Sequence, residues 1–251
     1  ELPPKIRQPI PIEMTRKQKK AYNELLDEMM LSLDDALLLT SNVLTRDLRL
    51  RQLLVCPRLL GIEEDGAAIE ALVWELLPSE LETNGAALIG TPFRQAVPYV
   101  KAAIARELPD VEVFEIHGGV KESASDIANS FQAHKGQKIL LFTIKSGASW
   151  TAHSAASEFF LGYEWSTNDM EQAEDRIHRL GQVNTVHINY LLHEETIDEA
   201  VIDALREKSS TAKWILEPKM MLAKLQQMRS KNIAKYDLYK EPIIQYNKDI
   251  D

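Results

Sequence analysis

The sequence predicts an α/β protein built on a parallel, doubly wound sheet. Between residues 85 and 192, five short apolar runs alternate with amphipathic segments, which is the pattern of strands joined by helices. The first eighty residues differ, because apolar residues there recur at helical spacing. We therefore expect one α/β unit with helical additions at both ends of the chain.

The N-terminal part predicts an extended segment followed by helices. Residues 1–14 contain four prolines, which favour extended backbone. A helix is expected from Thr15, because Thr15 and Gln18 have capping-box spacing and apolar residues follow at helical intervals. A second helix is expected over 44–54, where Cys56-Pro57 should end it, and a third over 67–77.

The central part predicts the sheet. Strands are expected at 86–90, 111–116, 138–143, 158–163 and 186–192, and helices at 97–108, 123–134, 168–179 and from Thr196 to Lys208. In parallel sheets, ligands gather at the carboxyl ends of strands. Those ends are Thr91, His117 with Gly118 and Gly119, and the run from Thr143 to Gly147.

The remaining residues predict a further helix after about 210 and then a polar tail. We expect an extended leading segment and helical insertion over 1–80, an α/β lobe over 81–208, and a C-terminal helical brace and tail over 209–251.

The formal charge is −9, which taken alone argues against a nucleic-acid partner. The charge is unevenly spread, however. Residues 61–200 hold 23 acidic against 9 basic side chains, whereas both ends of the chain are mildly basic.

Several classes of protein are excluded. One cysteine, Cys56, rules out a disulfide framework and a multi-cysteine zinc site, and no metal ligands are expected. There is no apolar run long enough to cross a membrane and no signal-peptide pattern, so we expect an intracellular protein of which this chain is a piece. A phosphate loop, a dinucleotide fingerprint and a nucleophile elbow are all missing, so the chain has no obvious complete active site.

The strongest functional signal is QAEDRIHRLGQ, residues 172–182. If the predicted helix runs through this segment, Gln172, Arg176 and Arg179 project from one face. Two guanidiniums side by side suit a phosphate, because the planar fork of arginine matches phosphate oxygens. From spacing alone, a solvated lattice of ion pairs among the acidic and basic residues is the favoured explanation of the segment.

QAEDRIHRLGQ closely resembles the last signature motif of the Swi/Snf-type branch of superfamily-two DNA translocases. The resemblance implies a RecA-like fold, with Arg176 and Arg179 as arginine fingers toward ATP and Mg²⁺ held mainly by another, N-terminal lobe. Gln172, Asp175 and Gly147 would then face the nucleotide.

Other segments resemble the same family in the same order over roughly residues 10–208. They include a helix with Gln18 and Tyr22, an arginine-rich helix ending at Cys56-Pro57, and the glycine pair after the second strand. The resemblance implies contacts with one strand of double-stranded DNA from Thr91, Gly118, Gly119, Thr143 and Lys145. It implies a second motor lobe that walks on duplex DNA and is inactive on its own.

The sequence departs from the family pattern at three places. Around Gly147 most of the usual glycines are absent, Ser166-Thr167 replaces Asn-Pro after Trp165, and no arginine follows the glycine pair in residues 121–126. Alternatives therefore stay open: a non-catalytic RecA-like interaction module, the second lobe of an RNA helicase, or a small-molecule enzyme with its own closed pocket. Gly118-Gly119 can also be a tight turn with positive φ, and Trp165 a packing residue.

Overall fold

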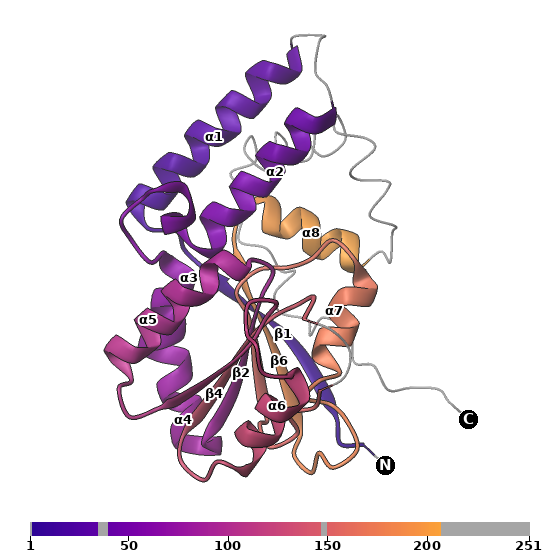
Figure 1. Cartoon of the computed structure of the whole chain (residues 1–251). Coiled ribbons are helices and arrows are strands. Elements are labelled where there is room, and N and C mark those ends of the chain that lie inside the picture. Colours follow the sequence, from indigo (N-terminus) through magenta and orange to yellow (C-terminus); the bar gives the residue numbers. More distant parts are fainter. Residues whose placement is uncertain (1, 35–39, 147–149, 207–251) are drawn as a thin grey trace, which may run out of the picture.

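The computed structural model describes residues 2–34, 40–146 and 150–206 (Figure 1). The helix expected after residue 210, the tail over 209–251 and Gly147 therefore lie outside the described residues. No helix within the described part is long and apolar enough to span a membrane.

Within these residues, one sheet of six parallel strands forms the centre of the molecule, in the order β1-β6-β5-β2-β4-β3. The strands are β1 (Lys5–Ile12), β2 (Ala86–Thr91), β3 (Glu112–Ile116), β4 (Lys138–Thr143), β5 (Ser157–Phe160) and β6 (Val186–His193). The predicted class, a doubly wound parallel α/β sheet of RecA-like type, is confirmed.

The extended N-terminal segment is a sixth strand that the sequence pattern did not predict as one. β1 pairs in parallel with β6, with Arg7 opposite Ile188. Val186 N–H donates to the Pro4 carbonyl, which places the bonds to β6 on the even-numbered residues of β1. Pro9 and Pro11 therefore turn their missing N–H groups toward the open edge, where proline is tolerated.

Helices cover both faces of the sheet (Figure 1). One face carries α3 (Ala67–Ala71), the π-helical turn η2 (Leu72–Leu76), α4 (Leu77–Asn84) and α5 (Val97–Glu107). The other carries α6 (Ala124–Ala133), α7 (Thr167–Glu174) and α8 (Ile197–Arg206). Neighbouring residues such as Leu88 and Ile89 enter different cores, one on each face. Burial on both faces explains why the strands are continuous apolar runs.

Two further helices, α1 (Arg16–Asp34) and α2 (Thr40–Val55), lie side by side beyond the carboxyl ends of the strands (Figure 1). Thr15 caps α1 as expected, because its Oγ1 accepts from Gln18 N–H at 3.1 Å. Val55 is the last residue of α2, so the predicted stop at Cys56-Pro57 is confirmed, and the short 3-10 turn η1 (Pro57–Leu60) follows.

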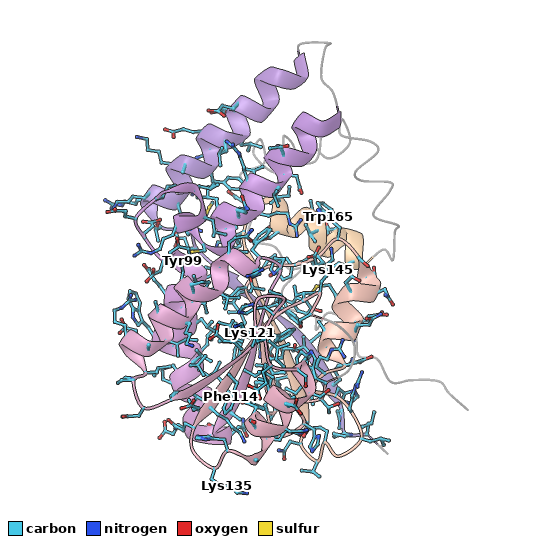
Figure 2. All side chains as sticks on the ribbon, viewed as in Figure 1. Tyr99, Phe114, Lys121, Lys135, Lys145 and Trp165 are labelled. Atoms are coloured by element: carbon cyan, nitrogen blue, oxygen red, sulfur yellow. The ribbon has the colours of Figure 1, made fainter. Side chains whose placement is uncertain are left out.

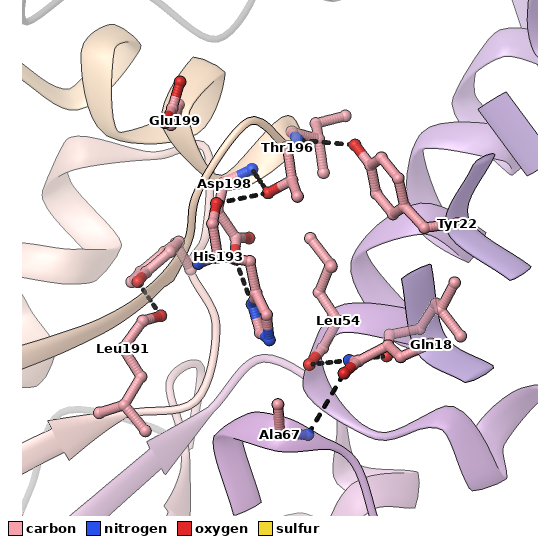
Figure 3. Close-up of polar contacts among 12 residues, drawn as sticks. Gln18, Tyr22, Leu54, Ala67, Leu191, His193, Thr196, Asp198 and Glu199 are labelled. Atoms are coloured by element: carbon pink, nitrogen blue, oxygen red, sulfur yellow. Dashed lines mark hydrogen bonds and ion pairs between the residues drawn. The ribbon is translucent and has the colours of Figure 1, made fainter. Parts of the chain in front are cut away.

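Buried polar side chains dock this helical pair on the α/β lobe (Figure 3). The Gln18 amide donates to the carbonyls of Leu53 and Leu54 at 2.9 and 3.2 Å and accepts from Ala67 N–H at 3.2 Å. The Tyr22 hydroxyl accepts from Ile197 N–H at 2.8 Å. Each contact satisfies a backbone group at a helix end that has no partner within its own helix.

Trp165 has the packing role expected of it. It is 6% exposed, and its indole Nε1 donates to Asp47 of α2 at 3.4 Å.

Candidate functional site

The arginine motif does not lie on a helix face, and this prediction was wrong. α7 begins after Ser166, whose Oγ accepts from Asp169 N–H at 3.3 Å, and it ends at Glu174. Arg176 and Arg179 follow in irregular turns, while Gln172 stays on the exposed helix surface.

After the helix ends, the carbonyls of Arg176 and Ile177 bond to groups outside the helix. Ala152 N–H donates to the Arg176 carbonyl at 2.9 Å. The amide of Gln182 donates to the Ile177 carbonyl at 3.1 Å and to the Ala155 carbonyl at 2.8 Å. In a continuing helix, these two motif carbonyls would accept from residues 180 and 181. Tertiary contacts thus replace helical ones at the carbonyls of Arg176 and Ile177.

The two arginines are close, but their environments differ. Arg176 is 3% exposed, and its guanidinium lies 5.2 Å from the centre of the Trp150 ring. Burial lowers the pKa of Arg176, and the nearby positive charge of Arg179 lowers it further. Arg179 is partly exposed and donates from Nη1 to Thr151 Oγ1 at 3.4 Å. An anion bound against this turn would relieve the repulsion between the two guanidiniums, so the residues present fit a phosphate.

Asp175, also expected at the nucleotide, lies on the same motif, whereas Gly147 lies outside the described residues. Asp175 is 52% exposed and forms an ion pair with Lys5 at 2.8 Å. His178 lies at the same turn, where its Nε2 is 2.7 Å from the Pro3 carbonyl.

The carboxyl ends of β3 and β4 form a hollow of about 240 Å³. Gly118, Thr143 and Lys145, three of the residues expected to contact DNA, line it together with His117 and Ser146. Residues more than twenty positions apart in the sequence are thus brought to one place by the parallel sheet.

The two remaining residues expected to contact DNA lie differently. Thr91 is fully buried, and its Oγ1 accepts from Phe93 N–H at 3.3 Å. Gly118 and Gly119 lie in a tight turn closed by Val120 N–H, which donates to the His117 carbonyl at 3.1 Å, but neither glycine has the positive φ expected of it. Gly119 N–H donates to His117 Nδ1 at 3.1 Å.

Lys145 is 61% exposed but not isolated. Its ammonium lies 3.0 Å from Glu164 and 3.7 Å from Asp169, on the same side of the molecule as Trp165 (Figure 2). A phosphate that binds this lysine must compete with two carboxylates.

Arg94 is a cation at this edge that the sequence analysis missed. It lies in the short turn η3 (Arg94–Ala96) after β2 and is exposed, and its guanidinium forms no hydrogen bond or ion pair with a described residue. A Cβ added at Gly119 would lie 2.3 Å from Arg94 Nη2. The missing side chain at Gly119 therefore makes room for a guanidinium, which no spacing rule along the chain reveals.

Glu158 is the second residue that the sequence analysis missed. It lies in β5, fully buried, and neither carboxylate oxygen has a hydrogen-bond partner among the described residues. Burial raises its pKa well above the ordinary value, and the charge of Glu174 adds to this rise. The group is therefore a neutral acid near the arginine-bearing turn. Across the described residues, no group of three or more His, Cys, Asp or Glu is placed to hold a metal ion.

The chain is similar in sequence to known helicases. No family model matches the chain. An uncharacterized ATP-dependent helicase of Mycoplasma pneumoniae is 29% identical over 212 residues, which cover 83% of this chain and 20% of that protein. The match covers only 8–21% of the length of such curated relatives.

Solved structures share the fold. The C-terminal part of the Fun30 ATPase domain superposes with a TM-score of 0.72 at 17% identity, covering 91% of this chain and 99% of that one. The Sulfolobus solfataricus SWI2/SNF2 ATPase core in complex with dsDNA gives a TM-score of 0.69 at 21% identity, covering 90% of this chain and 48% of that one.

Proposed function

In fold and in distant sequence relationship the chain is a C-terminal RecA-like lobe of the SWI2/SNF2 type, and from this premise we propose that it serves as the second motor lobe of an ATP-dependent translocase on double-stranded DNA. The observation that carries the proposal is the turn after α7, where Arg176 and Arg179 lie close enough to lower the pKa of Arg176.

The arginines act as fingers toward a nucleotide held by an N-terminal lobe. ATP supplies the γ-phosphoryl group whose transfer to water drives the cycle. The Arg179 guanidinium, partly exposed, binds the phosphoryl oxygens and stabilises the charge that develops on them. Arg176, which packs against Trp150, adds its positive charge next to Arg179, and Gln172 and Asp175 are exposed on the same motif. Mg²⁺ belongs with the acids of the N-terminal lobe.

The carboxyl edge of the sheet holds one DNA strand through its phosphates. Gly118, Thr143 and Lys145 line the hollow after β3 and β4, Gly119 follows Gly118 in the chain, and Thr91 Oγ1 holds the backbone after β2 by accepting from Phe93 N–H. Closing and reopening the two lobes around ATP then moves the enzyme along the duplex. Such contacts position the protein on DNA without reading its sequence.

The test is Arg179→Ala in the complete ATPase. An arginine finger contributes about 10³–10⁵ in rate, so we expect DNA-stimulated ATP hydrolysis to fall by about a thousandfold or more. Steady-state phosphate release measures this.

The matched control is Arg106→Ala, which removes a guanidinium that is 50% exposed on α5. It should leave hydrolysis unchanged. If Arg179→Ala also leaves hydrolysis unchanged, the lobe is a non-catalytic interaction module and the proposal fails.

A further inference from the structure

Residues 3–7, at the start of β1 and just before it, contact the end of α7 and the turn that bears Arg176 and Arg179. Lys5 Nζ lies 3.2 Å from Glu174 and 2.8 Å from Asp175. Arg7 Nε donates to both carboxylate oxygens of Glu174, at 2.8 and 2.9 Å. With the contact between His178 and the Pro3 carbonyl, β1 and the residues before it reach the turn at its first, second and fifth residues, counted from Glu174.

The contact between Arg7 and Glu174 is buried. Glu174 is 1% and Arg7 is 9% exposed. The Tyr190 hydroxyl of β6 also donates to Glu174. Burial alone would lower the pKa of Arg7, but the hydrogen bonds and charge of Glu174 raise it above the ordinary value. The Glu174 carboxylate is therefore held by side chains from two neighbouring strands, Arg7 of β1 and Tyr190 of β6.

Glu174 is also the last residue of α7, a helix of eight residues, and Arg176 stands two positions after it. A helix this short does not hold its own end in place. The register of the turn must therefore come from tertiary contacts, and the Arg7–Glu174 pair holds the last residue of α7, two positions before Arg176.

We propose that Arg7 and Glu174 are positioning residues for the arginine fingers: the pair fixes the end of α7 so that Arg176 and Arg179 meet the nucleotide in a productive geometry. The inference rests on the proposed function. A pair that only stabilised the fold could be replaced by apolar residues, since such replacement of a buried ion pair is often neutral or stabilising.

The experiment is a cycle of variants in the complete ATPase. Glu174→Gln keeps the shape of the side chain and removes its charge. A small misplacement of a catalytic group can lower a rate by about 10²-fold, so we expect kcat to fall between about tenfold and a hundredfold. The KM for ATP should change less than kcat. In an Arg179→Ala background, Glu174→Gln should have no further effect on kcat, because its effect passes through the arginine.

A second variant distinguishes a loss of positioning from a loss of folding stability. Arg7→Met with Glu174→Met replaces the pair by apolar side chains, and we expect the melting temperature to stay near that of the wild type while kcat remains low. Arg7→Lys keeps the charge but loses the fork, so it should recover only part of kcat. The control is Arg58→Met, which removes the pair between Arg58 and Asp65 at 2.8 Å on the other side of the molecule and should leave kcat unchanged.

Three outcomes would overturn the proposal: wild-type kcat in Glu174→Gln, wild-type kcat in the apolar double variant, or equal losses from Glu174→Gln with and without Arg179. Each is distinct from failure of the proposed function, which appears as unchanged hydrolysis in Arg179→Ala alone.

Discussion

A buried polar side chain, Gln182, stabilises the backbone of the arginine-bearing turn. Gln182, the last residue of the motif, is 6% exposed. Its Nε2 donates to two carbonyls, and its Oε1 accepts from Val183 and Asn184 N–H, both at 3.0 Å. The motif therefore combines two arginines that can meet an anion with a glutamine whose hydrogen bonds are all internal. Residues of one motif can thus serve different purposes.

Glu158→Gln tests the neutral buried acid. The folded pKa of Glu158 lies above its unfolded value, so the folded carboxyl stays protonated while the unfolded one ionises above about pH 4.3. The free energy of unfolding should therefore be highest below that pH and fall as the pH rises toward the folded pKa.

The glutamine variant cannot ionise, so it loses this dependence. We expect its free energy of unfolding, relative to the wild type, to rise between pH 4 and pH 8 by about 1.4 kcal/mol for each unit of pKa difference crossed. Chemical unfolding at the two pH values measures it, with Glu82→Gln at an exposed position as the control. Parallel pH profiles for wild type and Glu158→Gln would contradict a raised pKa.

Arg94→Ala tests the guanidinium beside Gly119. If Arg94 neutralises one phosphate, the slope of log affinity against log salt concentration should decrease by about 0.9 in the complete ATPase. Gly119→Ala should act in the same direction, because its Cβ would displace the guanidinium. Fluorescence anisotropy with a duplex oligonucleotide at several salt concentrations measures the slope. If Arg94→Ala gave the same slope of log affinity against log salt concentration as Arg106→Ala, Arg94 would not contact DNA.

At the scale of elements, the sequence pattern predicts where most strands and helices lie. It does not predict the contacts between elements that are distant in the sequence. The buried strands follow from continuous apolar runs, and the caps at Thr15 and Ser123 follow from local chemistry. The turn after α7 does not, because its carbonyls bond to Ala152 and Gln182, which lie outside the helix. The sequence predicts only an extended segment for β1, because its partner strand β6 is about 180 residues away.

The candidate site shows the same limit. Gly118, Thr143 and Lys145 could be grouped from the sequence, because strand ends of a parallel sheet share an edge. Arg94 and Glu158 could not, because their surroundings are set by residues that no spacing along the chain connects to them.

Gln18→Ala tests how the helical pair is docked. The substitution leaves the carbonyls of Leu53 and Leu54 and the N–H of Ala67 without their side-chain partner. Since leaving a buried polar group unsatisfied costs about 1–3 kcal/mol, we expect the free energy of unfolding to fall by about 2–4 kcal/mol. Urea unfolding measures it.

The neighbouring Lys17 provides the control, because it is exposed on the same turn of α1 and Lys17→Ala should change stability by less than about 0.5 kcal/mol. Hydrogen exchange at the Ala67 amide should become faster in Gln18→Ala. An unchanged exchange rate would mean that the amide finds another partner.

At the scale of the whole molecule, the acidic charge disfavours DNA binding, whereas the fold is similar to that of an ATPase core solved in complex with dsDNA. Residues 61–200 carry 23 acidic and 9 basic side chains, and they include every strand except β1. Lys145 is shared with two carboxylates, which leaves few uncommitted cations at the carboxyl edge. A lobe of this kind can hold phosphates at placed positions only when other parts of the motor bring the duplex to it.

The 251-residue chain alone should therefore bind duplex DNA weakly and hydrolyse essentially no ATP. Non-specific DNA binders have dissociation constants of about 10⁻⁴–10⁻⁶ M at physiological salt, and the isolated chain should lie at or beyond the weak end of that range. Anisotropy titrations between 50 and 200 mM salt, beside the complete ATPase, measure the difference. Tight binding that persists at the higher salt concentration would show that the lobe needs no partner to grip DNA. DNA-stimulated hydrolysis by the isolated chain would show that the fingers act on a nucleotide held within this lobe, and the two-lobe division of labour would then be wrong.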